Sequence, residues 1–348
     1  MAQGIVGVDI GTASIRAVEL EDAAGSRPTI VRFGEVAVPD GATRAGEVLE
    51  PHTVAAALKK LWSSAGFKSK DIVLGIGNQR VLARDVTLPR ATQAQIRESL
   101  PFQVQELLPV PVADAVLDFY PMAEDTAETG PVLHGLLIAA TKDAVMNNIL
   151  AARLAGLAAI DVDLIPFALT RVQRSANAMR GIVAVVDIGA TTTSVIIAKD
   201  GVPQFVRIIP VGGDELTKAI AERGQIPPGV AEQHKRQLGM TGGSMPEYRS
   251  LVEVIYAVTG ELLTGLRNTL SYYTSAHNGQ PIGAILLTGG GSRLSGLAVA
   301  LGEATRIPVT LANPLGGVQM ARSAKKQANT EAIQSLTVAL GLAIGATR

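Results

Sequence analysis

One short pattern occurs twice in this chain, and it limits the possible folds more than any other feature. In each copy a hydrophobic run ends in Asp-Ile-Gly, and small hydroxyl residues and a second hydrophobic run follow. The first copy spans residues 4–20 and the second spans residues 184–198. Each predicts a strand, a tight turn and another strand, with a carboxylate at the end of the first strand. The repeat indicates two related lobes, each presenting one hairpin to a shared cleft.

The residue types in both turns suit a phosphate ligand. A glycine lets the backbone approach an anion closely, and the amides and hydroxyls that follow it can form an anion-binding nest. The acid at each strand end, Asp9 or Asp187, is then free to hold Mg²⁺, which keeps much of its water and takes one or two carboxylates beside phosphate oxygens. The residues predicted to bind phosphate are Gly11, Thr12, Ala13, Ser14, Arg16, Gly189, Ala190, Thr191, Thr192 and Thr193.

Each hairpin taken alone has a purely structural interpretation, because hairpins with glycine at the turn are common. Two copies in matching contexts favour a functional interpretation. Arg16 has two interpretations of its own, since it could face a phosphate charge or pair with Glu19.

A third glycine-rich segment, residues 285–297, is typical of a buried strand, a glycine loop and the start of a helix. Glycines between a strand and a helix N-terminus allow a flat ligand or a phosphate to lie against the backbone. A flexible left-handed turn is the structural alternative, although it would need only one glycine. The residues predicted at this site are Gly289, Gly290, Gly291 and Ser292.

These three segments, in this order and spacing, resemble the first phosphate, second phosphate and adenosine motifs of the actin-like ATPase superfamily. Within that superfamily the chain resembles the PilM family of type IV pilus assembly proteins, which is related to the cell-division protein FtsA. The closer resemblance is carried by residues 96–111 followed by 116–120, and by residues 163–169, 211–218 and 339–344. Together the motifs cover almost the whole chain.

The resemblance implies an α/β fold of the actin-like ATPase class, with two ribonuclease H-like lobes around a nucleotide cleft and an FtsA-type inserted subdomain of the 1C kind. The expected units are lobe 1 (subdomain 1A) at 1–88, completed by about 160–180 and 325–348; the inserted subdomain at 89–159; lobe 2 (subdomain 2A) at 181–214, completed by 280–324; and subdomain 2B at 215–279. A length of 348 residues agrees with about two domains.

The resemblance also implies ATP and Mg²⁺ as ligands, with residues 289–292 beside the adenosine. Gly212 and Gly213 would then lie near the phosphates. Alternatively, this pair is a plain junction between a loop and a helix capped by Asp214.

Base recognition departs from the family pattern. The positions where the family has an acid and a base against the ribose and adenine are Gly265 and Asn268 in this chain. Glu261 and Arg267 could take over those contacts, or they could form a surface ion pair.

Slow or absent hydrolysis is expected, and no catalytic residue is assigned. In many actin-like ATPases a polar residue early in the helix that connects the lobes orients the attacking water. Here residues 166–169 are Pro-Phe-Ala-Leu, and Gln173 is two turns along the predicted helix but near the cleft. Phosphoryl transfer to water depends largely on positioning and electrostatics.

Composition excludes several other classes. Lys+Arg and Asp+Glu are balanced at 31 each, so nothing indicates binding to nucleic acid or to an anionic membrane surface. The absence of cysteine excludes disulfides and thiolate metal sites. No apolar run approaches the roughly 20 residues that span a bilayer, and a strand begins close to Met1 without a leader. We therefore expect a cytoplasmic protein that is peripheral to the inner membrane through a partner.

Three functions are open on this fold. The resemblance implies a nucleotide-dependent scaffold of the inner-membrane pilus assembly platform, which binds the N-terminal cytoplasmic peptide of the inner-membrane protein PilN in a groove between lobe 1 and the inserted subdomain. Residues 102–112, which are apolar and rich in proline, could form one wall of that groove. The alternatives are an FtsA- or MreB-like filament and a small-molecule (sugar) kinase with Asp187 or Asp214 as base.

Overall fold

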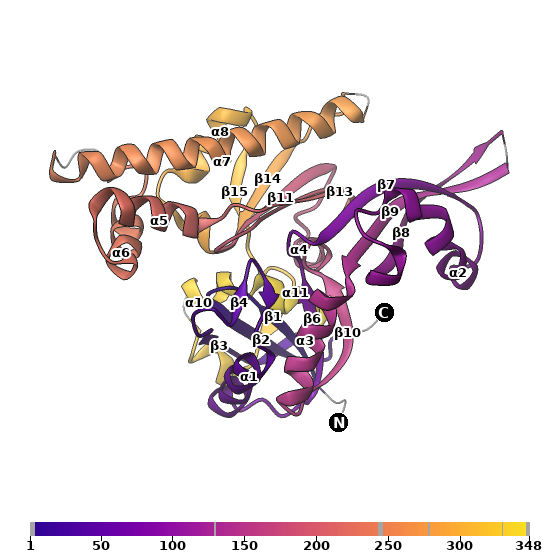
Figure 1. Cartoon of the computed structure of the whole chain (residues 1–348), viewed down its shortest axis with the longest axis horizontal. Helices are drawn as coiled ribbons and strands as arrows, with labels where there is room; N and C mark the ends of the chain where they lie inside the picture. Colours follow the sequence, from indigo (N-terminus) through magenta and orange to yellow (C-terminus); the bar gives the residue numbers. More distant parts are fainter. Residues whose placement is uncertain (1–3, 129, 243–245, 278, 329, 346–348) are drawn as a thin grey trace.

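The computed structural model describes residues 4–128, 130–242, 246–277, 279–328 and 330–345. Over these residues the chain forms two lobes, each built on a mixed sheet, and a smaller sheet that projects to one side (Figure 1).

The two large sheets repeat one arrangement of strands. In each, three strands form an antiparallel meander, and two further strands add in parallel beside the first of them. Over the described ranges the strand order is β10-β6-β1-β2-β3-β16 in the first lobe and β13-β12-β11-β14-β15 in the second. When the second order is reversed to β15-β14-β11-β12-β13, it matches the first strand for strand, apart from the added β16. The predicted duplication is therefore confirmed.

The strands of the first sheet are β1 (Ile5–Ile10), β2 (Ser14–Glu21), β3 (Thr29–Ala37), β6 (Asp71–Ile76), β10 (Ala158–Leu164) and β16 (Gln319–Met320). Those of the second are β11 (Ile182–Ile188), β12 (Thr193–Lys199), β13 (Val202–Ile209), β14 (Ala284–Thr288) and β15 (Val309–Leu311). Strands β1 and β11 are covered on both faces and are therefore almost continuously apolar.

Helices cover the outer faces of both sheets. The first lobe carries α1 (Pro51–Ala65) and α3 (Lys142–Leu154), and the second carries α5 (Gly213–Gly224), α6 (Pro228–Leu238), α7 (Arg249–Ala276) and α8 (Leu297–Thr305). Helix α1 illustrates why these segments are helical, because proline occupies its first turn and Gly66 ends it in the left-handed conformation. Its buried residues Val54, Leu58 and Leu61 recur at helical spacing and pack on the sheet.

Two helices lie between the sheets and belong to the cores of both lobes. Helix α4 (Ile165–Ser175) and helix α11 (Thr337–Gly345) contribute buried residues to one cluster with strands of the first sheet and to another with strands of the second. Short helices α9 (Arg322–Lys325) and α10 (Thr330–Ser335) lead into α11. Glycines at this layer allow very close contact, because a Cβ on Gly7 or Gly341 would overlap backbone atoms of Ala339 or Ala168.

The small sheet defines an insertion whose limits differ from those expected at 89 and 159. Strands β7 (Val81–Pro89), β9 (Gly130–Thr141) and β8 (Ala115–Ala127) pair in that order, and α2 (Gln93–Val104) packs against them. Strand β7 therefore belongs to the insertion, whereas β10 pairs with β6 in the first lobe and α3 packs on α1. The strand pairing puts the insertion at about residues 81–141.

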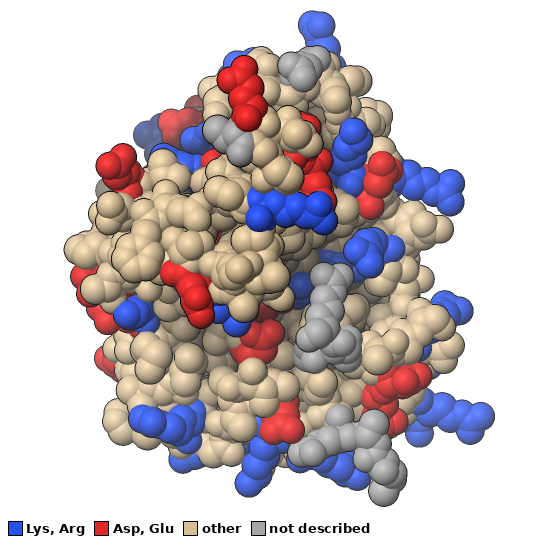
Figure 2. All heavy atoms as spheres, turned by 90° about the vertical axis from the view of Figure 1, so that its right-hand side faces the viewer, with Lys and Arg blue, Asp and Glu red and all other residues tan. Residues whose placement is uncertain are grey.

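The face of the molecule that includes the insertion carries charges of both signs. Figure 2 shows Lys and Arg interspersed with Asp and Glu on the face at the right-hand side of Figure 1. None of the helices within the described residues is long and apolar enough to cross a membrane.

The central layer generates a prediction about stability. We expect Gly341→Ala to lower the free energy of unfolding by about 1–3 kcal/mol, because the new methyl group would be forced against the α4 backbone. Gly265→Ala in α7 is the control. A Cβ there meets no atom within 4 Å, so the substitution should raise stability by about 0.5–1 kcal/mol. Denaturant unfolding of both variants tests this, and equal stability of the two would contradict it.

Candidate functional site

A cavity of about 860 Å³ lies between the two lobes. Both Asp-Ile-Gly turns and the glycine-rich loop after β14 line it, together with residues of α5, α6 and α7 and of the junction between α10 and α11. The predicted site residues that reach the cavity are Asp9, Gly11, Thr12, Ala13, Ser14, Arg16, Asp187, Gly189, Ala190, Thr191, Thr192, Gly212, Gly213, Gly289, Gly290 and Gly291. Segments far apart in the sequence thus meet at one site.

The two turns have the same local geometry. The N–H of Gly11 donates to the carbonyl of Ser14 at 3.0 Å, and the N–H of Gly189 donates to the carbonyl of Thr192 at 2.9 Å. A Cβ on either glycine would lie within about 3.1 Å of the same carbonyl oxygen. Glycine therefore suits both turns, because a side chain there would push against the backbone of the same turn.

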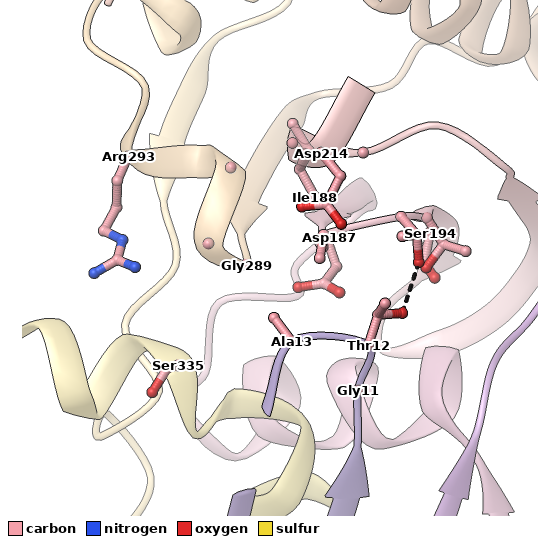
Figure 3. Close-up of a pocket in the computed structure, with 18 of the residues that line it drawn as sticks. Gly11, Thr12, Ala13, Asp187, Ile188, Ser194, Asp214, Gly289, Arg293 and Ser335 are labelled. Carbon is pink, nitrogen blue, oxygen red and sulfur yellow. Dashed lines mark hydrogen bonds between the residues drawn. The ribbon is translucent and has the colours of Figure 1, made fainter. Parts of the chain in front are cut away.

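The two turns touch each other across the cavity. The hydroxyls of Thr12 and Thr191 lie 2.9 Å apart and are hydrogen bonded, as the dashed line in Figure 3 marks. Figure 3 also shows the Asp187 carboxylate directed toward Thr12 and Ala13 of the opposite turn. A ligand that enters between the turns must replace this contact.

The carboxylates at the two strand ends are held in an unfavourable electrostatic environment. Burial, followed by the negative charge of Asp9, raises the pKa of Asp187 from 3.8 to about 7, and Arg16 opposes the shift. Burial also raises the pKa of Asp9, with Arg16 again opposing. A divalent cation beside this pair would supply the missing positive charge, and two carboxylates suit Mg²⁺ that is also bound to phosphate oxygens.

Arg16 lines the cavity, but it does not pair with Glu19, which was the structural alternative. Its guanidinium lies 3.0 Å from Glu35 and 3.7 Å from Asp9, while Glu19 pairs with Arg32 at 2.9 Å. Residues 16 and 19 point to opposite faces of β2, and Glu35 lies opposite Arg16 on β3. The alternative prediction, that Arg16 pairs with Glu19, is therefore wrong.

The Gly212–Gly213 pair lines the cavity and supports the second turn. The N–H of Gly213 donates to the carbonyl of Gly189 at 2.9 Å, and the N–H of Asp214 donates to that of Ala190 at 2.8 Å. A Cβ on Gly212 would lie 2.5 Å from the carbonyl oxygen of Ala190. The amides of Gly213 and Asp214 thus hold the second turn in place.

The three glycines of the third segment have different surroundings. Gly289 has φ of +84°, and it packs with Gly291 against Ile188 at the end of β11. Gly290 faces open space, where an added Cβ would meet no atom within 4 Å. Ser292 is not part of the lining: it is buried, and its hydroxyl donates to the carbonyl of Gly289 at 2.7 Å.

Four other predicted positions lie outside the cavity. Thr193 is fully buried and donates its hydroxyl to the carbonyl of Val211 at 2.7 Å. Glu261 and Arg267 are exposed, because the cavity side of α7 is formed by residues 258, 259 and 262 and these two lie on other sides of the helix. Gln173, predicted near the cleft, is buried away from it, and of α4 only Ile165 lines the cavity.

Several lining residues carry no recognisable sequence pattern. The Lys235 ammonium donates to the hydroxyl of Thr217 at 2.8 Å and to the carbonyl of Gly213 at 3.1 Å, and Glu232 pairs with it at 2.5 Å. Arg293 and Ser335 line the cavity from the third loop and from α10 (Figure 3). A Glu and a Lys three residues apart on a helix usually form an exposed pair, so sequence gives no signal for this group.

One part of the cavity is apolar. Leu216, Val258, Leu262, Leu294 and Leu297 line it, and all of them belong to or pack on the core of the second lobe. The carboxylates, hydroxyls and glycine turns lie where the strands of both lobes end. The arrangement suits an elongated ligand with an anionic part between the turns and a flat, less polar part against the second lobe.

Comparison with known proteins agrees with this geometry. A family model described as type IV pilus assembly protein PilM matches residues 7–347. The chain belongs to this family. The resemblance inferred from the sequence is therefore confirmed.

Solved structures and a curated relative extend the comparison. A PilM–PilN type IV pilus biogenesis complex contains a chain that is 27% identical, with a TM-score of 0.85 and coverage of 99% of this chain and 98% of that chain. MreB5 of Spiroplasma citri bound to AMPPNP is 12% identical, with a TM-score of 0.53 and coverage of 98% and 95%, which supports the fold alone. The expected actin-like fold class is confirmed.

FtsA of Bacillus subtilis is 23% identical over 256 residues. The match covers 67% of this chain and 58% of FtsA, so the chain spans less than two thirds of that relative. The chain is thus similar in sequence to FtsA over this part.

The raised pKa of Asp187 generates a prediction about pH. When the pKa of a group is higher in the folded chain than in the unfolded chain, the folded protein becomes less stable as pH rises between the two values. For Asp187 this range runs from about 4 to about 7. In the absence of ligand, Asp187→Asn should therefore melt at a higher temperature than the wild type at pH 8, with little difference at pH 4. Thermal unfolding across this range is the measurement.

The matched control is Asp143→Asn, on the exposed side of α3. This change should leave the difference between pH 4 and pH 8 as it is in the wild type. A melting temperature of Asp187→Asn at or below that of the wild type at pH 8 would contradict the prediction.

Proposed function

We propose that this chain is a nucleotide-dependent scaffold of type IV pilus assembly, which binds magnesium ATP between its lobes and the N-terminal peptide of PilN at its inserted subdomain. The observation that carries the nucleotide part is the pair of matched turns, each with a carboxylate at its strand end, which meet at one cavity. Family membership and the similarity to a PilM–PilN complex support the partner.

The residues at the cavity fit a magnesium nucleotide. Asp9 and Asp187 would hold the cation, which would shield the phosphate charges and remove the repulsion between the two carboxylates. The turns at 11–14 and 189–192 would surround the phosphates.

The second lobe would hold the nucleoside. Gly290 presents open backbone on which a base can lie, and Lys235 and Glu232 are within the same lining, where ribose hydroxyls would find a donor and an acceptor. The leucine-rich wall would cover the face of the base. MreB5, which shares the fold, binds the adenine nucleotide AMPPNP, and this supports adenine as the base here.

We also propose that hydrolysis is slow. Within the described residues, helix α4 contributes only Ile165 to the lining, so no polar side chain of this helix can orient a water molecule at the phosphates. Binding, rather than turnover, would then be the useful property of the cavity.

The partner surface is proposed at the junction of the insertion with the first lobe. Phe102 on α2 is 79% exposed, and Met146 on α3 and Ile160 on β10 are 56% and 52% exposed. Aromatic side chains often dominate the binding energy of interaction sites, so Phe102 is proposed as the residue that anchors the peptide. The protein would thereby sit on the cytoplasmic side of the inner membrane without inserting into it.

Titration with magnesium ATP in a calorimeter tests the nucleotide part. The wild type should bind one equivalent, and Asp9→Asn and Asp187→Asn should each weaken Mg²⁺-dependent binding by about tenfold or more, since each removes a charge that faces the cation. Asp143→Asn should bind as the wild type does. Equal affinity of all four proteins would exclude the two carboxylates as the magnesium site.

A synthetic peptide with the N-terminal sequence of PilN from the same organism tests the partner. It should bind the wild type and bind Phe102→Asp at least tenfold more weakly, because a charge would replace an apolar contact. Tyr272→Asp is the matched control, since Tyr272 is an exposed aromatic residue on α7, in the other lobe. If both variants bind the peptide like the wild type, the partner surface lies elsewhere.

A further inference from the structure

A short hairpin between β3 and α1 lies beside the first turn of the cavity. It consists of β4 (Thr43–Arg44) and β5 (Glu47–Val48), joined by a two-residue turn in which Ala45 and Gly46 have φ of +49° and +79°. A turn with two left-handed residues favours Asn, Asp or Gly, so alanine at its first position is strained. Strained residues persist where the surroundings hold them in place, often at functional sites.

One side of the hairpin holds the first phosphate turn. The hydroxyl of Thr43, a residue that is 6% exposed, lies 3.3 Å from the carbonyl oxygen of Gly11 and 3.1 Å from that of Thr12. The N–H of Gly46 donates to the hydroxyl of Thr12 at 3.3 Å, and Gly46 itself lines the cavity. The position of Thr12 thus depends on the hairpin.

The other side of the hairpin contacts both connections between the first lobe and the insertion. Glu47 pairs with Arg80 at 2.7 Å, and Gly46 packs against Asn78, just before β7 begins. On the return connection, the side-chain amide of Asn147 in α3 donates to the carbonyl of Val48 at 3.1 Å. Helix α3 follows β9 without a gap. The hairpin therefore lies between the phosphate turn and the base of the inserted sheet.

Hydrogen bonds link the hairpin to the second lobe through Thr12. Its hydroxyl accepts from Gly46 and pairs with Thr191. A phosphate oxygen between the turns has no proton to donate, so it would accept from both threonine hydroxyls and separate them. The Thr12 side chain would move, and its contact with Gly46 would change with it.

We propose that the β4–β5 hairpin transmits occupancy of the interlobe cavity to the inserted sheet. Thr43 and Gly46 are its positioning residues at the cavity, and the Glu47–Arg80 pair and Asn147 are its contacts with the insertion. This inference rests on the proposed function, because it takes a phosphate-bearing ligand as the group that separates Thr12 from Thr191. It assigns a role to a segment that carries none of the phosphate or adenosine motifs.

Amide hydrogen exchange of the full chain, measured by mass spectrometry with and without saturating magnesium ATP, tests the proposal. In the wild type the nucleotide should change the exchange rate of peptides that cover residues 77–92 and 138–150 by about fivefold or more, the smallest effect usual for coupled sites. Arg80→Gln should abolish most of this change while its affinity for magnesium ATP stays that of the wild type.

The control is Arg90→Gln, which breaks a pair with Glu124 that is 3.3 Å long and lies wholly within the insertion. It should respond to the nucleotide as the wild type does. Thr43→Val should reduce both the affinity and the response, and Thr43→Ser, which restores the hydroxyl, should recover both.

The outcomes separate this inference from the proposed function. If the wild type does not bind magnesium ATP, the proposed function fails and the inference fails with it. If it binds but exchange in the two peptides is unchanged, or if Arg80→Gln responds fully, the nucleotide site stands and the role of the hairpin is overturned.

Discussion

The close packing of α11 against α4 and the first sheet is the contact on which the rest of the molecule depends. Because residues 7 and 341 are glycines, no side chain separates the elements, and backbone packs directly on backbone there. The same two helices fill the cores of both lobes, so the two sheets are held in one relative orientation. The ends of β1 and β11 consequently meet, and the turns that follow them can share one cavity.

The cavity itself works against stability. The negative charge of Asp9 acts on Asp187, burial disfavours the charge on both carboxylates, and Arg16 of β2 opposes these effects. Such an arrangement is retained where a ligand supplies the compensating charge, since a group that destabilises the free protein can strengthen binding. The unfavourable pair is therefore better evidence for a cation site than a stable ion pair would be.

Sequence predicted those parts of the site that depend on local backbone geometry. The two turns and the glycine loop are encoded within a few residues each, and the structure brings them together. Strand pairing is not local: nothing within 81–89 reveals that it pairs with 130–141, and so the insertion begins earlier than expected. Which side of a helix faces a cavity is likewise set by tertiary contacts that the sequence does not show. The prediction therefore placed Glu261 and Arg267 at the cavity, whereas Val258, Thr259 and Leu262 line it. Lys235 gave no signal, because its pair with Glu232 on the same helix looks like an ordinary surface pair and its contacts with Gly213 and Thr217 of α5 are tertiary.

The supports behind the two turns have diverged, although the turns themselves match. The second turn is fixed by backbone bonds from residues 213 and 214, which follow directly from a strand of its own sheet. The first turn accepts a backbone bond from Val38, which follows β3, at 3.1 Å, and it also has a side-chain hydroxyl and one long amide contact from a separate hairpin. A duplicated motif has in this way become asymmetric, because a separate hairpin contacts the first copy in addition to its own sheet. The same hairpin contacts both connections to the insertion, so the first copy of the motif is the one that is linked to the insertion through it.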